Sequence, residues 1–312
     1  MCETEGVYIP LFLQYWWMDA VCADKRWDVA LAYDDAGGIT AVMPYLKGCR
    51  VGMRYILPPQ LTPFTGPWYR YPSAALSERE RLDFEEHAAQ QLLDNIDRQH
   101  ASVFIQCFSP QITNWLPFYH RGYKQTTRYT YRIDDISDTQ CVFDMLTPHR
   151  RRKIRQWDGQ VAFDVLSSED AAWFADFHAA YWRAKGQRDL LPRELMVRLM
   201  ASAISRDAGV VLRLMDGSGE VVAAAFAVYD ERCAYLLQSA LAPSRHRNGH
   251  KEVLLWKLIE WLSPHTKAFD FEGSMVKSIE YFNRSFGTRQ VPYFQIERYS
   301  NILIEWYMRL RK

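Results

Sequence analysis

Apolar and polar side chains alternate along two stretches of the chain. Residues 29–46 (VALAYDDAGGITAVMPYL) and 210–229 (VVLRLMDGSGEVVAAAFAVY) each contain two alternating segments around a turn rich in Asp and Gly. A period of two residues on both sides of such a turn is typical of a β-hairpin. The pattern therefore predicts one hairpin in each half of the chain.

The residues that follow each hairpin change to a helical period. Apolar positions fit one face of a helix in residues 77–99 and again in residues 250–262. Residues 102–133 and 268–299 then each read as strand, short helix, aromatic-glycine stop and strand. Both halves have the same order of elements, which mixes antiparallel and parallel strands. This similarity is either an internal structural repeat or the chance likeness of two α/β units.

A polar segment, DDISDTQ, separates the two halves within residues 134–150. We therefore expect an N-terminal domain of residues 1–140 and a C-terminal domain of residues 141–312. The second half also carries two amphipathic stretches between residues 168 and 206, each ended by a glycine, which predict two additional helices. The last twelve residues, NILIEWYMRLRK, are amphipathic too, and we expect their apolar face to pack on the protein rather than on a membrane.

Composition narrows the class of protein. The 312 residues are 48% hydrophobic and 14% aromatic, which predicts a large folded core rather than disorder. A net charge of +1 argues against a general nucleic-acid coat, so no DNA partner is expected. The six cysteines form no CxxC pair, which indicates reduced core residues of a cytoplasmic protein and no metal site. We find no secretory signal and no run near ~18 apolar residues, so no transmembrane segment is predicted.

Several short motifs carry a family resemblance. FYHRGY, residues 118–123, resembles the Tyr-x-x-x-Gly-Phe stretch that closes the last helix of GNAT N-acyltransferases. IPLFLQYWWMDAV, LPPQLTPFTGPW, HRRRKIRQW and FDFEGS…YFNRSFG follow one another in an order that resembles the Fem-type peptidyltransferases and FemAB-related acetyltransferase-like proteins. The resemblance implies an α+β (mixed α/β) fold of two tandem GNAT-like domains, each with a mixed antiparallel and parallel sheet flanked by helices.

The resemblance also implies a reaction. GNAT members transfer an acyl group from acyl-CoA, such as acetyl-CoA, to an amine, and Fem members transfer an aminoacyl group from tRNA to a cell-wall precursor. We favour an N-acyltransferase that uses acyl-CoA and a small-molecule or peptide amine acceptor, because no extended basic surface for tRNA is evident. The alternatives are a Fem-type transferase with aminoacyl-tRNA as donor, and a non-catalytic binding protein on the same scaffold.

The segment SRHRNGHK, residues 244–251, lies at the predicted start of an apolar helix. A helix N-terminus attracts anions, whereas basic side chains gain little there, so their presence indicates an external anion. The alternative is a solvated basic loop. In the preceding apolar strand, polar residues either line the donor cleft or bond to a neighbouring strand. The expected donor-binding residues are Gln238, Ser239, Arg245, Arg247, Asn248, Gly249 and Lys251.

Two carboxylates stand at the end of the predicted strand FDFEGS. Asp270 and Glu272 point to one side of that strand, at the end where α/β sheets bind ligands. We expect Glu272 to be the base that accepts the amine's proton, with Asp270 second. The alternative is that such a carboxylate caps the next helix, with Ser274 in the same role. In the same helix, Tyr281 either protonates the leaving group, as the resemblance implies, or is a buried core residue. Lys277 either polarises the donor carbonyl or is an exposed helix lysine.

The remaining candidates concern the acceptor. The resemblance implies that LPPQLTPFTGPW helps to wall the acceptor cleft, with Trp68 and Tyr69 as stacking surfaces. In the basic cluster HRRRKIRQW, residues 149–157, not every cation can face one way on a helix. We expect Lys153 and Arg155 to reach a substrate phosphate; the alternative is a solvated face beside the domain linker.

Overall fold

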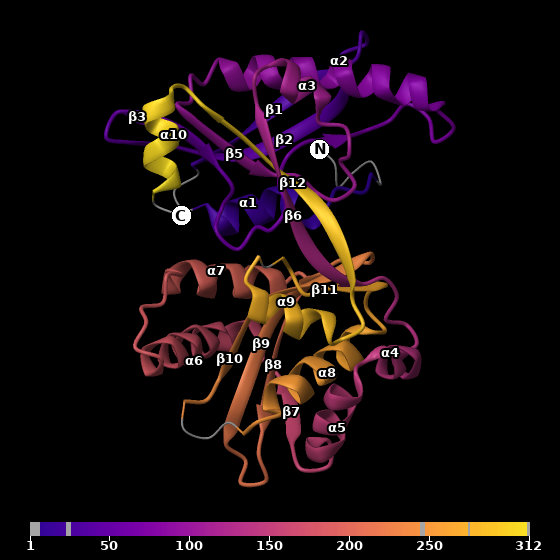
Figure 1. Cartoon of the computed structure of the whole chain (residues 1–312), viewed down its shortest axis with the longest axis vertical. Coiled ribbons are helices and arrows are strands. Elements are labelled where there is room, and N and C mark those ends of the chain that lie inside the picture. Colours follow the sequence, from indigo (N-terminus) through magenta and orange to yellow (C-terminus); the bar gives the residue numbers. More distant parts are fainter. Residues whose placement is uncertain (1–6, 23–25, 244–246, 274, 311–312) are drawn as a thin grey trace. The chain divides into compact units, whose positions relative to one another are not determined.

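The computed structural model describes residues 7–22, 26–243, 247–273 and 275–310 (Figure 1). The chain forms two compact units, Met1–Arg128 with Pro292–Lys312, and Tyr129–Val291. These units differ from the predicted domains 1–140 and 141–312, because the chain divides earlier and its C-terminal segment returns to the first unit. Both divisions fall inside long strands, β6 (Lys124–Ile133) and β12 (Arg289–Tyr299), so each strand contributes residues to both units.

The first unit is built on a sheet with the order β1-β2-β3-β5-β12 and β4 beside β2. β3 and β5 are parallel, and the other pairs with a defined register in this unit are antiparallel. In addition to parts of β6 and β12, its elements are η2 (Leu11–Leu13), α1 (Tyr15–Val21), β1 (Trp27–Tyr33), β2 (Ile39–Arg50), β3 (Met53–Leu57), β4 (Trp68–Tyr69), α2 (Glu78–Asp97), β5 (Val103–Cys107), α3 (Leu116–His120) and α10 (Ile302–Arg309).

Helix α2 covers the core of the first unit. Its N-terminus is fixed by a capping box in which Ser77 and Glu80 bond to each other's backbone N–H, an arrangement that stabilises a helix by about 1 kcal/mol. The apolar face of the helix packs against β1, β2 and β5 through Ala88, Ala89, Leu92, Leu93 and Ile96. The helix predicted over residues 77–99 and the hairpin predicted over residues 29–46 are therefore confirmed.

The second unit has the strand order β6-β11-β10-β9-β8-β7, in which only β10 and β11 are parallel among the described residues. In addition to parts of β6 and β12, its elements are α4 (Thr139–Met145), α5 (Pro148–Trp157), β7 (Ala162–Val165), η4 (Ser168–Asp170), α6 (Ala171–Ala184), α7 (Arg193–Ile204), β8 (Gly209–Met215), β9 (Val221–Tyr229), β10 (Cys233–Leu241), α8 (His250–Leu262), β11 (Ala268–Asp270) and α9 (Lys277–Arg284).

Helix α8 is the central helix of the second unit. Val253, Leu254, Leu255, Leu258 and Ile259 are all buried in one core cluster with residues of β8, β9 and β10. Strands β8 and β9 form the predicted second hairpin, and α6 and α7 are the two predicted additional helices. The periodicity of the sequence therefore predicted the elements that carry the cores of both units.

Three further expectations from the sequence concern the cysteines, the C-terminal helix and membrane-spanning helices. The prediction of core cysteines is right for Cys22 and Cys233, whereas Cys49 and Cys141 are exposed. The expectation that the C-terminal helix packs its apolar face on the protein holds only for Ile304 and Met308 of α10, which are half-buried, whereas Ile302, Leu303 and Trp306 are exposed. Among the described residues, every helix is too short or too polar to cross a bilayer.

Candidate active site

Strands β10 and β11 create an open strand edge in the second unit. Their parallel pairing ends at Tyr235 and Asp270, and β11 stops there, whereas β10 continues to Leu241. Beyond Tyr235, β10 pairs with β9 on one side, and the described strands offer no partner on the other. The register with β9 also shifts between Leu236 and Gln238, which marks a bulge. Backbone groups along this edge can pair with the amide groups of a ligand.

Asp270 is buried at the end of β11. Its Oδ1 accepts a hydrogen bond from the Thr130 hydroxyl and a second, 2.8 Å long, from the Glu272 backbone N–H. Burial raises the pKa of the Asp270 carboxyl to about 6, and these two hydrogen bonds oppose the increase. One bond ties Asp270 to the neighbouring strand β6, and the other holds the backbone of Glu272 in place.

Glu272 has an unusual backbone and an unusual carboxyl environment. Its φ angle of 62° lies in the left-handed region, which costs a non-glycine residue about 1–3 kcal/mol. Its Oε1 atom is buried and has no hydrogen-bond partner in the part of the chain that the structure describes. Burial, and then the charge of Asp270, raises the pKa of Glu272 well above its usual range. A half-buried glutamate with a strained backbone, one enclosed carboxyl oxygen and a raised proton affinity is typical of a catalytic acid or base.

The alternative that these carboxylates cap α9 is not supported. The N-cap residue of α9 is Val276, which has no side-chain cap. Ser274, which the same alternative included, lies outside the described residues. On α9 itself, Lys277 is exposed at the first position and Tyr281 is 66% exposed. The alternative that Tyr281 is a core residue is therefore wrong.

Gly249 fixes the loop at the start of α8. Its φ angle of 115° is left-handed, and a Cβ atom there would lie 2.6 Å from the ring of Trp157. Trp157 also donates a 3.0 Å hydrogen bond from Nε1 to the carbonyl of Asn248, so α5 packs directly on this loop. Lys153, one turn earlier on α5, places its Cδ atom 3.4 Å from the same Cβ position. Only glycine satisfies both the backbone angle and the close approach.

Positive charge gathers beside this loop. The Lys251 ammonium lies 4.5 Å from the centre of the Phe282 ring, and the Arg150 guanidinium lies 4.3 Å from the same ring. Burial lowers the pKa of Lys251, and the charges of Lys185 and Arg150 lower it further, against the raising effect of Glu252. These residues comprise three cations, Lys251, Lys185 and Arg150, and one carboxylate, Glu252. Glu252 forms an ion pair with Arg150. This excess of positive charge, at a helix N-terminus, suits an anionic group such as a phosphate.

The other predicted residues of the basic loop occupy varied positions. Arg247 and Asn248 are exposed, and the Arg247 backbone N–H donates to Nδ1 of His250. Arg245 lies outside the described residues. Gln238 and Ser239 are half-buried on β10, beyond the end of its pairing with β11. Arg150, which was not predicted to bind the donor, belongs to the basic run of residues 149–157, and nothing in that run distinguishes it as the buried member.

A buried imidazole network joins β10 to α6, and sequence reasoning missed it. His178, on α6, is 1% exposed and has three partners. Its Nδ1 lies 2.7 Å from Asp189, and its Nε2 lies 3.0 Å from the Gln238 amide and accepts a 3.1 Å bond from Trp182 Nε1. Because Trp182 can only donate, Nε2 must be an acceptor and Nδ1 must carry the proton. The Gln238 atom beside Nε2 is Oε1, and because both are then acceptors, this tautomer requires the amide to be flipped so that its NH₂ group donates to the ring.

The same network continues to the cation cluster. The other oxygen of Asp189 accepts a 2.9 Å bond from the Leu191 backbone N–H, which fixes the loop between α6 and α7. At the end of α6, the Lys185 ammonium lies 5.6 Å from the Trp182 ring. The charge of Lys185 is one of those that act on Lys251. The network thus joins Gln238 on the open strand to the end of α6, where Lys185 lies.

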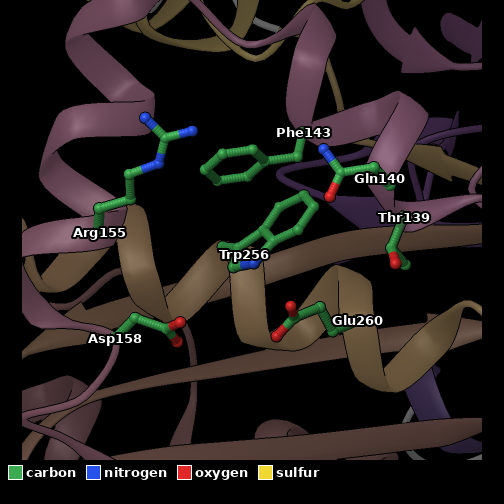
Figure 2. A pocket seen from close by; sticks show the side chains of 7 residues that line it. All are labelled: Thr139, Gln140, Phe143, Arg155, Asp158, Trp256 and Glu260. Atoms are coloured by element: carbon green, nitrogen blue, oxygen red, sulfur yellow. The ribbon is translucent and has the colours of Figure 1, made fainter.

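A separate pocket lies among α4, α5 and α8 (Figure 2). Its volume is about 320 Å³, and it is lined by Thr139, Gln140, Phe143, Arg155, Asp158, Trp256 and Glu260. The Arg155 guanidinium lies 5.2 Å from the centre of the Phe143 ring, which packs edge-on against Trp256. Positions two apart on a helix point to different sides, so α5 directs Arg155 here and Lys153 toward Gly249. The structure therefore places Lys153 and Arg155, the two residues predicted to bind a substrate phosphate, at different sites.

The two candidates of the first unit lie on β4. Tyr69 is buried against Tyr71 and Phe84, and Trp68 is half-buried. A buried ring offers no stacking surface, so the structure does not support that role for Tyr69. The role of Trp68 in acceptor binding stays a prediction.

Comparisons with known proteins agree with this architecture. Residues 149–273 match the family model described as acetyltransferase (GNAT) domain. The structure of FemX has a TM-score of 0.67 at 10% identity and covers 91% of this chain and 92% of its own. L-PGS from Bacillus licheniformis has a TM-score of 0.57 at 12% identity, with 91% and 87% covered. A search of curated protein sequences finds no match.

A third similar structure belongs to a tandem GNAT protein. A tandem GNAT protein from the clavulanic acid biosynthesis pathway has a TM-score of 0.51 at 8% identity, with 89% of this chain and 84% of that chain covered. At these identities the likeness concerns the fold. The predicted mixed α/β fold with tandem GNAT-like halves, and the resemblance to Fem-like proteins, are confirmed.

Proposed function

We propose that this chain, a tandem GNAT-fold protein whose second unit carries an acetyltransferase (GNAT) domain, is an N-acyltransferase that uses acyl-CoA. The observation that carries the proposal is Glu272, whose buried Oε1 has no partner among the described groups, just beyond the point where β10 and β11 separate. In the proposed reaction the amine nitrogen bonds to the thioester carbonyl carbon and the C–S bond breaks. The proton of the amine passes to Glu272, and the coenzyme A thiolate leaves.

Glu272 is suited to the proton transfer. Its raised pKa means that it binds a proton more tightly than an ordinary carboxylate, as a base working near neutral pH should. Asp270 is too enclosed to act in the same way, and its hydrogen bond to the Glu272 backbone gives it a positioning role. Tyr281 and Lys277, both exposed on α9, remain the proposed proton donor and carbonyl contact.

The groups that would hold acyl-CoA fit its chemistry. The diphosphate needs cations and N–H donors, which Lys251, Lys185, Arg150 and the start of α8 supply. The pantetheine arm carries two amides, which match the unpaired edge of β10 along residues 236–241. The proposal places the reaction in the cytoplasm, in keeping with the free thiols of the described cysteines.

Calorimetric titration with acetyl-CoA tests the donor. We expect micromolar binding that weakens at least about tenfold in Lys251→Met, since a buried cation contact to phosphate contributes about 1.5–3 kcal/mol. Arg152→Met, at an exposed residue of the other basic run, residues 149–157, is the control and should bind normally. Binding that ignores Lys251→Met would overturn the phosphate site. No binding at all would point to aminoacyl-tRNA, the donor that the Fem resemblance implies, and tRNA would be titrated next.

A further inference from the structure

Helix α10 in the first unit is turned with its largest apolar side chains outward. Four large apolar side chains on one face, Ile302, Leu303, Trp306 and Leu310, are 61% to 83% exposed. The one carboxylate of the helix, Glu305, is buried instead. The side of the helix that faces the protein carries Glu305 with the half-buried Ile304 and Met308, so α10 is apolar on both sides and leaves its largest apolar side chains exposed, which is unusual for a surface helix. A cluster of exposed large apolar residues marks an interaction surface.

Charged contacts hold the helix in this orientation. Both oxygens of Glu305 accept 2.8 Å bonds from the Lys124 ammonium on β6, and one also accepts a 2.7 Å bond from Arg309. At the N-terminus, the Asn301 side chain accepts a 3.0 Å bond from the Ile304 backbone N–H. Turning the apolar face inward would break these ion pairs, so the exposed face is the state that the sequence specifies.

Size argues against a second copy of the chain as the occupant. A helix of eight residues is only ~12 Å long and ~10 Å wide, so the face covers a few hundred Å² at most. A stable protein dimer needs about 800 Å² from each partner. Charge gives the same answer, because Lys124 and Arg309 flank the face and both are more than half exposed. In a two-fold dimer the same patch meets itself, which would place these cations opposite one another.

A lipid surface matches both properties of the face. We propose that α10 docks the protein on a bilayer that contains anionic lipids. Leu303, Trp306 and Leu310 enter the headgroup region, where Trp is favoured, and Lys124 and Arg309 contact lipid phosphates. Such a short helix gives weak, reversible binding that depends on anionic headgroups and on salt.

Vesicle co-sedimentation of the full-length protein tests this docking. The probes are vesicles of phosphatidylcholine alone and of phosphatidylcholine with phosphatidylglycerol, each over a salt series. We expect binding to the anionic vesicles that falls with salt. Leu303→Ser with Trp306→Ser should weaken it at least about tenfold, since both apolar side chains that enter the headgroup region are lost. Leu116→Ser, an exposed leucine of α3 in the same unit, is the matched control and should bind as the parent does.

The outcomes separate the possible occupants. Both variants should keep the parent's thermal unfolding temperature, because the substituted side chains are exposed. Absence of vesicle binding, or binding that the double variant leaves unchanged, would overturn the proposal. So would a concentration-dependent dimer that the double variant abolishes, since that result would assign the face to a second copy.

Discussion

Glu272 combines a left-handed backbone with a buried carboxyl oxygen that has no hydrogen-bond partner among the described residues. If it is the base, Glu272→Gln should lower the turnover rate by about 10²–10⁴-fold while donor affinity stays the same. The rate of the parent should rise with pH through the raised pKa of Glu272, because a base must be deprotonated, and this rise should vanish in the variant. Acyl-transfer kinetics over a pH series measure both. Glu231→Gln, in the exposed turn after β9, serves as control.

Glu272→Gln should stabilise the fold at neutral pH, although it lowers the turnover rate. The folded state holds the Glu272 proton more tightly than the unfolded chain does. The folded state therefore loses stability as pH rises above the ordinary carboxyl range, and Gln does not ionise. We expect Glu272→Gln to raise the melting temperature at neutral pH and to change it little at a pH below that range. Each kcal/mol corresponds to about 2–4 °C. If the variant and the parent had the same melting temperature at each of the two pH values, the Glu272 carboxyl would not be buried.

The His178 network gives a spectroscopic prediction. In ¹⁵N-labelled protein, the ring of His178 should show the neutral form with the proton on Nδ1, because Trp182 donates to Nε2 and Asp189 accepts from Nδ1. Gln238→Glu replaces the NH₂ donor with a carboxylate and should lower the free energy of unfolding by about 1–3 kcal/mol. A proton found on Nε2 would mean that the carbonyl of Gln238, not its NH₂ group, faces the ring.

At the scale of elements, the loop before α8 depends on Gly249. Gly249→Ala would strain the left-handed backbone and bring a Cβ to 2.6 Å from Trp157. We expect a loss of about 1–3 kcal/mol of folding free energy and weaker acetyl-CoA binding, because α5 and the N-terminus of α8 would separate. Gly217→Ala is the control, since no atom lies within 4 Å of a Cβ placed there and the φ angle of Gly217 is not left-handed. Chemical denaturation and calorimetry measure the two effects.

Periodicity predicted the elements better than it predicted what they face. The hairpins and the helices α2 and α8 follow from local patterns that their own cores impose. The direction of α10 does not, because an amphipathic pattern shows that two faces differ and not which one is buried. Its orientation depends on Lys124, which lies 181 positions before Glu305 in the sequence. His178 was missed for a related reason, since Gln238 is 60 positions away and no local spacing joins them.

At the scale of the whole molecule, the second unit is inserted into the first. Strand β12 starts in one unit and then pairs with β5 in the other, and α10 reaches Lys124 on β6. A fragment of residues 141–312 therefore carries β12 and α10 without these partners, and it lacks the part of β6 that pairs with β11. Exposed strand edges of this kind promote aggregation. The sequence could not show this exchange, because local patterns mark where a strand lies and not which unit completes it.

The insertion leads to a prediction about where the donor binds. Glu272, Lys251, the open edge of β10 and the His178 network all lie within residues 129–291. A fragment of those residues should melt cooperatively and bind acetyl-CoA within about threefold of the full chain, since each proposed donor contact is retained. The fragment 141–312 should aggregate or fail to melt cooperatively. If residues 141–312 fold and bind while residues 129–291 do not, the part of β6 beyond Arg128 is dispensable and the C-terminal segment completes the donor site. If neither fragment binds and the full chain does, the first unit contributes directly to holding the donor.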